Sequence, residues 1–314
     1  MFLGSNLNTH ISILISRTMI NYLKESTFAV KDVVTQAWTV TKENYFSIAT
    51  LCFLIFITAS TSTFMAFFME EVNVGIKIIM LTIFIFCYCV IELGLIKYIL
   101  RLLDKGDADI LIVETLPTRA EVFKFLLATL YFGIAILVSM LFIVPILYFV
   151  LYLLDSLFKY MVAQHMITSY GLTGAIIVQV AVNITALTVF LAFLKIIFFP
   201  FFIIDKGTSA FESIKLSMAV TKGNFMKLVF FLFAQVILQA IVFFLFSFGF
   251  WLIFRVIGFF WDLEFFQQYS SLIVVVFTSF VMVPFTTAFL AVAYRKIMSD
   301  YKGDEHPDII HNIV

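Results

Sequence analysis

Charge is scarce in this sequence, and long stretches have none. Charged residues make up 13% and hydrophobic residues 63% of the 314 residues, whereas a typical globular chain is about a quarter charged and about half apolar. A soluble fold could not bury this much apolar surface, which includes 41 phenylalanines. The composition therefore predicts an integral membrane protein.

Other absences exclude several classes of function. The formal net charge is zero and no run of basic residues exists, so we expect no nucleic-acid partner. The H-E-x-x-H, G-x-S-x-G, P-loop and G-x-G-x-x-G motifs are missing. The charged segments between the apolar stretches are too short for a soluble catalytic domain. We therefore expect no enzymatic activity and no cofactor.

Metal-binding residue types are also few. The 3 cysteines all lie in apolar runs, and Cys87 and Cys89 point to different faces of a helix, so a structural role is expected for them. The 4 histidines lie mostly in the terminal segments. The pair Glu70-Glu71 has no basic or histidine partner nearby in the sequence and indicates a solvated turn. No metal site is predicted.

Six apolar stretches are long enough to cross a bilayer, which takes about 20 helical residues. The fold class predicted is therefore all-α, a polytopic transmembrane helical bundle with amphipathic helices at the cytoplasmic interface. The fifth stretch is longer than needed, and a break near Gly249 or Gly258 is one explanation. The stretches are residues 45–68, 76–103, 123–154, 173–203, 225–260 and 270–294.

The basic residues fall on alternate connections. All but Lys77, Lys159 and Arg255 of the 20 Lys and Arg residues lie in the N-terminal segment, around the second and fourth connections, or in the tail. Basic residues are retained in the cytoplasm, so both termini are predicted to be cytoplasmic. The domains expected are an interfacial segment (1–27), a membrane domain (28–295) and a cytoplasmic acidic tail (296–314).

Two segments resemble each other at an offset of 180 residues, which indicates an internal repeat of 28–103 and 208–294. Val-Thr-Lys-x-Asn followed by an aromatic residue occurs at 40–45 and again at 220–225, and an acidic residue recurs at Asp32 and Glu212. Chance resemblance in so biased a chain is the alternative.

Both copies show an amphipathic helical pattern before a span. In the first copy the apolar positions from Val30 to Thr41 form one helical face, so the helix can lie in the interface with Trp38 at headgroup level. Ser26 or Thr27 could cap the first helix, and Thr208 or Ser209 the second. A fainter third version lies at 116–125, where Pro117 and Glu121 suit a helix start.

The Lys-x-Asn-aromatic motif would be the corner at which each surface helix turns into the bilayer. Lys42 and Lys222 would then meet phosphate headgroups, and Asn44 and Asn224 would satisfy backbone groups freed at the corner. An ordinary helix start without lipid specificity is the other interpretation.

Polar side chains inside the spans are expensive and suggest a partner or a function. Glu92 is the main candidate, and Lys97, Arg101 or Lys195 could pair with it. Arg255 could meet Asp262 or Glu264. Amide side chains also occur within the spans, at Gln179, Asn183, Gln235 and Gln239. Such residues more often form hydrogen bonds between helices than line a transport path.

Two motifs resemble a bacterial family. The first motif is a Gly in the second span followed by a short turn, at Gly94 and Lys105-Gly106-Asp107. The second motif is a span that ends in Pro and is followed in order by Asp, Ala, Ser and Lys-Gly. The second set stands at Pro200, Asp205, Ala210, Ser213 or Ser217, and Lys222-Gly223. This pattern is similar to the membrane domain found with glycerophosphoryl diester phosphodiesterases and to its stand-alone, uncharacterised YciC-like relatives. No phosphodiesterase domain accompanies it here, so the resemblance implies a bacterial inner-membrane module and no hydrolysis.

The function expected is a non-enzymatic inner-membrane protein that interacts with lipids, as a scaffold or an accessory subunit of a membrane complex. Its expected partners are membrane lipids, with other membrane-protein subunits or further copies of the chain as additional candidates. The alternative is a small-solute or lipid transporter with Glu92 in a cavity between helical hairpins.

Overall fold

In the computed structural model, residues 27–68, 72–105, 110, 112–163, 170–257 and 264–299 are described. These residues form helices joined by short connections, and no strand occurs among them. The helices are α2 (Val30–Glu43), α3 (Tyr45–Phe68), α4 (Val74–Lys105), α5 (Ile112–Thr115), α6 (Arg119–Ala163), α7 (Tyr170–Ile196), α8 (Phe199–Lys206), α9 (Ala210–Ile257) and α10 (Glu264–Ser299).

Six of the helices in this part of the chain, α3, α4, α6, α7, α9 and α10, are long and apolar enough to cross a membrane. This confirms the predicted fold class, and the protein is an integral membrane protein. The fourth and fifth spans differ from the prediction in how they are built. The fourth span ends at Ile196, and the residues that follow form the separate short helix α8. Helix α9, which contains the fifth span, continues through Gly249 without a break and ends at Ile257. Gly258, the other predicted position of a break, lies outside the described residues.

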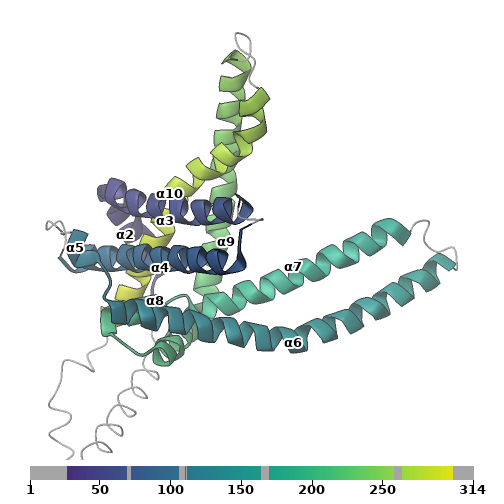
Figure 1. Cartoon of the computed structure of the whole chain (residues 1–314), viewed down its shortest axis with the longest axis horizontal. Helices are drawn as coiled ribbons and strands as arrows, with labels where there is room; N and C mark the ends of the chain where they lie inside the picture. Colours follow the sequence, from purple (N-terminus) through teal and green to yellow (C-terminus); the bar gives the residue numbers. More distant parts are fainter. Residues whose placement is uncertain are drawn as a thin grey trace, which may run out of the picture.

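The six long helices form three hairpins that meet at one end and diverge at the other (Figure 1). We call the common end the base. It contains α2, α5, α8 and the adjoining parts of the long helices, and we call the diverging parts of the hairpins the arms. The base comprises residues 28–52, 89–105, 112–128, 194–231 and 282–299. The arms comprise the described residues 53–68, 72–88, 129–163, 170–193, 232–257 and 264–281.

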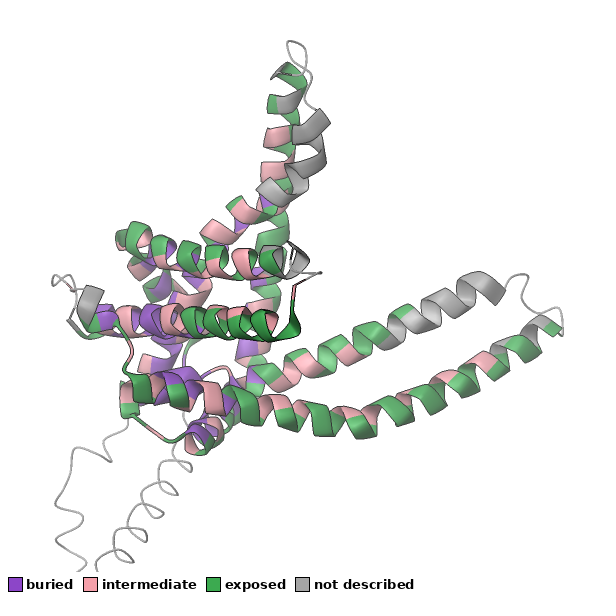
Figure 2. Cartoon of the chain, in the orientation of Figure 1, coloured by how far each residue is buried: buried purple, intermediate pink, exposed green. Residues whose placement is uncertain are grey.

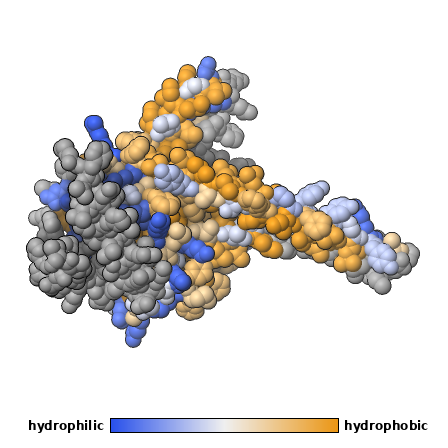
Figure 3. Space-filling view, turned by 90° about the horizontal axis from the view of Figure 1, so that it is seen from below, coloured by the Kyte–Doolittle hydropathy of each residue, from blue (hydrophilic) through white to orange (hydrophobic). Residues whose placement is uncertain are grey.

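Burial separates the base from the arms (Figure 2). Of the residues whose burial is described, the arms contain only Gln235, Val274 and Thr278 as buried side chains, and every other buried residue lies in the base. The arms are covered with exposed apolar side chains (Figure 3). Such a surface requires lipid, or another apolar protein surface, around it.

Helix α8 lies at the centre of the base. Phe199 to Ile203 are all buried, and they contact two neighbouring apolar clusters. Pro200 stands at the start of the helix, where its missing N–H costs nothing. Gly207 ends the helix in the left-handed conformation, with φ of 62°, which glycine adopts without a Cβ clash.

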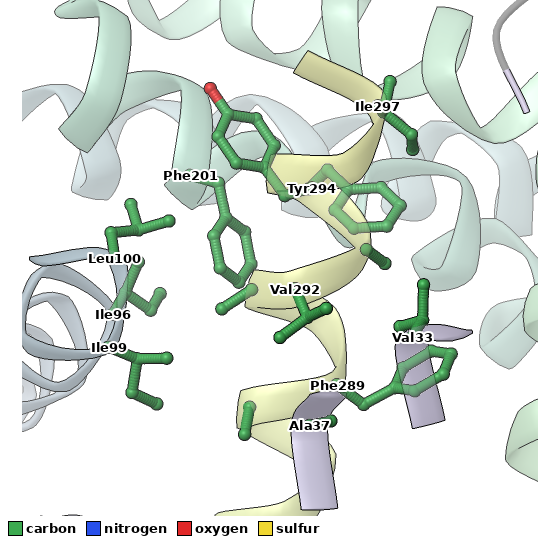
Figure 4. Packing of buried hydrophobic residues seen from close by; sticks show 14 of the residues in the cluster. Val33, Ala37, Ile96, Ile99, Leu100, Phe201, Phe289, Val292, Tyr294 and Ile297 are labelled. Carbon is green, nitrogen blue, oxygen red and sulfur yellow. The ribbon is translucent and has the colours of Figure 1, made fainter. Parts of the chain in front are cut away.

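The larger cluster joins helices that are far apart in the sequence (Figure 4). Phe289 and Tyr294 of α10 are fully buried. Phe289 stacks on Phe231 of α9, and Tyr294 contacts Phe201 of α8. The apolar face of α2 joins this cluster through Val33 and Ala37.

This packing changes the interpretation of the first amphipathic helix. Its apolar face was expected to lie in the lipid interface, but Val33, Ala37 and Thr41 are buried and α2 packs against α10. The prediction of a surface helix whose apolar face contacts lipid is therefore wrong for that face.

The predicted corners also differ between the copies. In the first copy α2 ends at Glu43, Asn44 lies outside helical geometry and α3 starts at Tyr45, so the corner is confirmed as a helix boundary. In the second copy Asn224 lies inside the continuous helix α9, so the predicted corner there is wrong. The third predicted interfacial helix is likewise the first part of α6, which starts at Arg119.

Proline marks the joint between the base and the α9–α10 arm. Pro284 has no N–H to give to the carbonyl oxygen of Phe280 one turn earlier, and the hydroxyl of Tyr45 donates to that oxygen at 3.2 Å. The first span therefore satisfies a backbone acceptor that the proline leaves free in the sixth.

Several predictions fall outside the described residues. They concern the segment 1–26, Glu70-Glu71, the Gly106-Asp107 turn, the four histidines, Asp262 and the tail from Asp300 onward.

Candidate functional site

The polar side chains of the base concentrate around Arg295 of α10. Its guanidinium donates to Asp205 of α8 at 2.7 Å and to Asp104 at the end of α4, also at 2.7 Å. The hydroxyl of Tyr294 donates to the other oxygen of Asp205 at 2.9 Å. One arginine therefore joins the ends of the second, fourth and sixth long segments of the chain through charge-assisted hydrogen bonds.

Both carboxylates come from the same short sequence. Helix α4 ends with Asp104-Lys105 and helix α8 with Asp205-Lys206, and a glycine follows each pair in the sequence. The carbonyl oxygen of Gly207 accepts a hydrogen bond from Lys124 of α6, so the second turn also ties the third span to the base. The sequence analysis missed Asp104, Tyr294 and Arg295 and assigned no role to Asp205. The repeated Asp-Lys-Gly was the signal that could have found the two carboxylates.

The basic residues expected near Glu92 have other partners. Lys97 pairs with Glu121 of α6 at 3.3 Å, and Arg101 pairs with Glu114 of α5 at 2.6 Å. Glu121 also accepts from the backbone N–H of Thr118, whose hydroxyl accepts from the N–H of Glu121, which is a reciprocal cap for α6. The predicted pairing of Glu92 with Lys97 or Arg101 is therefore wrong, because both cations reach across to the loop and helix that follow α4.

Glu92 lies about five residues, or roughly 7–8 Å along the helix, from Lys97 towards the arm. Its carboxylate interacts with the hydroxyl of Tyr88 one turn earlier. The Tyr88 ring lines a pocket of about 280 Å³ between α3, α4 and α10, whose other walls include Cys52, Phe56 and Phe280. Glu92 itself does not line this pocket.

The two segments of the predicted repeat touch each other at Phe28. The side-chain oxygen of Asn224 accepts from the backbone N–H of Phe28 at 3.3 Å, and Lys227 donates to the Phe28 carbonyl oxygen at 2.7 Å. Helix α2 has no side-chain cap of its own, and its N-cap residue is Ala29. Ser26 lies outside the described residues, and Thr27 does not cap α2. Ser209 does cap α9, because its hydroxyl accepts from the N–H of Glu212.

The contact with Phe28 shows that Asn224 is not available to bind a lipid headgroup. Asn224 is 1% exposed, so its amide cannot reach a lipid headgroup, and that prediction is corrected to a contact between the repeats. Asn44 donates only to the carbonyl oxygen of Val40 among the bonds seen. The side chains of Lys42 and Lys222 are exposed, and Trp38 is 57% exposed with its ring edge against Phe285. These three remain accessible to lipid.

The remaining polar candidates differ in burial. Gln235 is buried and donates to Thr286 of α10 at 2.8 Å, which is the expected contact between helices, while Gln239 is exposed. Lys195 is exposed, and its backbone carbonyl accepts from Thr221 of α9. Arg255 lies over the Trp251 ring, with 5.5 Å between guanidinium and ring centre.

The positions of the basic residues agree with an orientation in which the whole base lies on one side of the membrane. Every described basic residue that the sequence assigns to the cytoplasm lies in the base. Lys77 lies near the start of α4, Lys159 near the end of α6 and Arg255 near the end of α9, which are the arm ends of these helices. Within the described residues, no group of three His, Cys, Asp or Glu side chains could hold a metal ion. The basic residues of the base are Lys31, Lys42, Lys97, Arg101, Lys105, Arg119, Lys124, Lys195, Lys206, Lys215, Lys222, Lys227, Arg295 and Lys296.

Comparison of the chain with models of protein families, with curated proteins and with solved structures finds no match.

Proposed function

We propose that the protein is a non-enzymatic scaffold of the membrane, in which the base holds three helical hairpins and the arms present apolar faces to lipids and to partner subunits. One observation supports this most: ion pairs of the base join one helix to another, while the arms contain almost no buried side chain among the residues described. A channel would be expected to have a polar path along the arms. The charged side chains of the base instead form ion pairs between helices.

The exposed basic residues of the base suggest how the scaffold would sit on the bilayer. Lys42 follows the buried Thr41, and Lys222 follows the buried Thr221. Each lysine side chain is therefore exposed next to a residue that belongs to the buried part of the base. Anionic headgroups attract such residues with about 1 kcal/mol each near the surface. Trp38, exposed on the same helix as Lys42, is a residue type enriched at this level.

Lipid binding tests this part of the proposal. We expect Lys42→Glu/Lys222→Glu to reduce the number of phosphatidylglycerol molecules retained by the purified protein in native mass spectrometry, because two attractive contacts become repulsive. A control with the same change of charge is Lys159→Glu/Arg255→Glu, at the far ends of two arms. Equal lipid retention by the protein and the first variant would contradict headgroup binding at the base.

Transport is the second candidate, because the Glu92–Tyr88 pair adjoins the pocket between α3, α4 and α10. In that case a proton exchanged at Glu92 would accompany the solute, and Glu92→Gln would abolish flux into vesicles at unchanged folding. Tyr88→Phe, which removes only the hydroxyl, is the matched variant and should reduce flux less. Proton-coupled flux that survives Glu92→Gln would remove this candidate.

We also propose that the protein belongs to the bacterial inner-membrane family that its motifs resemble and that both termini are cytoplasmic. Gly94, Pro200, Asp205 and Ser217 from those motifs all lie in the base. Gly94 faces the carbonyl oxygen of Thr115, where a Cβ would lie 3.6 Å away, and the Ser217 hydroxyl accepts from the N–H of Phe198. The resemblance would then reflect the way the base is built.

A further inference from the structure

One face of the first turns of α9 is exposed and carries apolar and basic side chains in alternation. We call this face the α9 stripe, and its members are Phe211, Lys215, Met218, Lys222 and Met226. At about 100° per residue, these five positions lie within roughly 80° of one another around the helix. From Ala210 to Met226 every other residue except Gly223 is buried or half-buried. The stripe is therefore the one side of this segment that the base leaves uncovered.

Contacts with two other spans place the segment at the edge of the membrane. The carbonyl oxygen of Gly207, just before α9, accepts from Lys124 near the start of the third span. The Thr221 hydroxyl donates at 3.1 Å to the backbone carbonyl of Lys195, at the end of the fourth span. The first turns of α9 therefore run from the base end of one span to the base end of another, which is the level at which lipid headgroups begin.

The apolar members of the stripe continue into a surface that requires an apolar environment. Phe211, Met218 and Met226 are 58%, 44% and 73% exposed. Helix α9 runs on into the arm without a break, and the exposed Phe230 and Phe233 lie within about 40° of Met226 around the helix. Since lipid is the ordinary neighbour of such an arm surface, the stripe is the continuation of a lipid-facing side to the headgroup level.

The charges of the stripe match anionic lipids. Lys215 and Lys222 lie about 10 Å apart along the helix, and the stripe has no acidic residue. The Lys215 ammonium group lies 4.5 Å from the centre of the Phe211 ring, so a cation and an apolar ring stand side by side. Lysines and large apolar side chains on one face are typical of a helix at the boundary between headgroups and acyl chains. A protein partner would have to supply an apolar surface and acidic groups at both positions.

The other segment of the predicted repeat exposes the same order of side chains at the same offset. In each segment a large apolar residue, a lysine and a second large apolar residue are exposed: Trp38, Lys42 and Phe46, and 180 residues later Met218, Lys222 and Met226. The backbones differ, because α2 ends before Asn44 whereas α9 is continuous. The same exposed order on two different backbones favours a common environment for both segments.

We propose that the α9 stripe lies against the membrane at the boundary between headgroups and acyl chains, where it binds anionic phospholipids. Lys215 and Lys222 contact the phosphates, and Phe211, Met218 and Met226 lie among the upper parts of the acyl chains. The proposal rests on the proposed scaffold function. It adds Lys215 and three apolar side chains to the lipid-binding surface of the base.

Quenching of tryptophan fluorescence by brominated lipids tests the contact with acyl chains. The 3 native tryptophans are replaced by phenylalanine, and one tryptophan is introduced into the full chain on the stripe, as Met218→Trp or Phe211→Trp. Gln36→Trp, on the exposed polar side of α2, is the control. In vesicles whose acyl chains carry bromine close to the headgroup, we expect quenching of both stripe reporters and little quenching of the control.

Bromine on one lipid at a time tests the lysines. In vesicles of equal parts phosphatidylglycerol and phosphatidylcholine, we expect the Met218→Trp reporter to show phosphatidylglycerol enriched at least about fivefold, the factor that corresponds to one lysine near the surface. Lys215→Glu should abolish this enrichment, because the stripe then has no net charge. Lys296→Glu, the same change of charge at an exposed position of α10, should leave it intact.

Three other outcomes would overturn the proposal. Quenching of Met218→Trp by aqueous acrylamide and not by brominated lipid would place the stripe in water, and quenching by neither would mean that a protein surface covers it. Equal quenching by the two lipids would contradict the role of the lysines. Lipid retention in Lys42→Glu/Lys222→Glu involves neither Lys215 nor Met218, so the stripe and the proposed scaffold can fail separately.

Discussion

The base and the arms are made from the same six helices but have opposite physical characters. In the base, α2, α8 and six helix ends bury a continuous aromatic and aliphatic core and tie their backbones together with ion pairs and hydrogen bonds. The arms expose apolar side chains on most of their surface. The difference indicates that the specific contacts which define the structure are concentrated in the base, whereas the arms depend on whatever surrounds them in the membrane.

The largest expected effect is the loss of stability when a phenylalanine of the base is replaced, compared with the same replacement in an arm. Phe289 is 0% exposed in the base and Phe244 is 71% exposed on the α9 arm. We expect Phe289→Ala to lower the free energy of unfolding by about 3–5 kcal/mol through the lost contacts and the cavity. Phe244→Ala should change it by less than about 0.5 kcal/mol. Unfolding in mixed detergent micelles measures both, and equal losses would contradict a base-centred core.

A somewhat smaller effect is expected at the ion pairs of the base. Arg295→Ala leaves the largely buried Asp205 carboxylate without its cation, and we expect a loss of about 2–3 kcal/mol, below the range for fully buried pairs because Arg295 is partly exposed. The neighbouring Lys296→Ala, at an exposed side chain, serves as the control. A second variant, Asp104→Asn, should cost less because Asp104 is more exposed than Asp205. The same unfolding assay would count against the account if Lys296→Ala were the more damaging change.

The smallest effect distinguishes the two segments of the predicted repeat. Asn224→Ala removes the acceptor of the buried Phe28 N–H, and we expect a loss of about 1–2 kcal/mol. Asn44→Ala, at the equivalent position of the first segment, removes only a local bond to Val40 in the preceding helix α2 and should cost less than about 1 kcal/mol. If the two substitutions cost the same, the bond between Asn224 and Phe28 contributes nothing beyond a local helix contact.

The spans were predictable from the sequence because the length of an apolar run needs no knowledge of neighbours. The corners were not. Asn44 and Asn224 make the same local bond to the carbonyl four residues earlier, yet only the first stands at a helix boundary. The local motif therefore does not decide where the helix ends, and Asn224 in addition makes a long-range bond to Phe28 that no local pattern shows.

The polar site was only partly predictable for a similar reason. Glu92 and Lys97 were paired because they are close along one helix, whereas Lys97 reaches Glu121 across the connection that folds back on α4. The convergence of Asp104 and Asp205 on Arg295 joins residues roughly 90 and 190 positions apart. Such a pairing depends on how α8 inserts between the spans, which sequence spacing does not reveal.

The most direct test of the central claim is a nitroxide scan of α6 from Leu137 to Val150 in lipid vesicles, with oxygen accessibility measured by electron paramagnetic resonance. The account predicts high lipid exposure at nearly every position, with only partial protection on the stripe of Met140, Ile143 and Leu147. A parallel scan of α10 from Ala288 to Tyr294 should show strong protection. Full protection of a second stripe on α6 in the protein alone would show that the arms close into one packed bundle and would contradict the account.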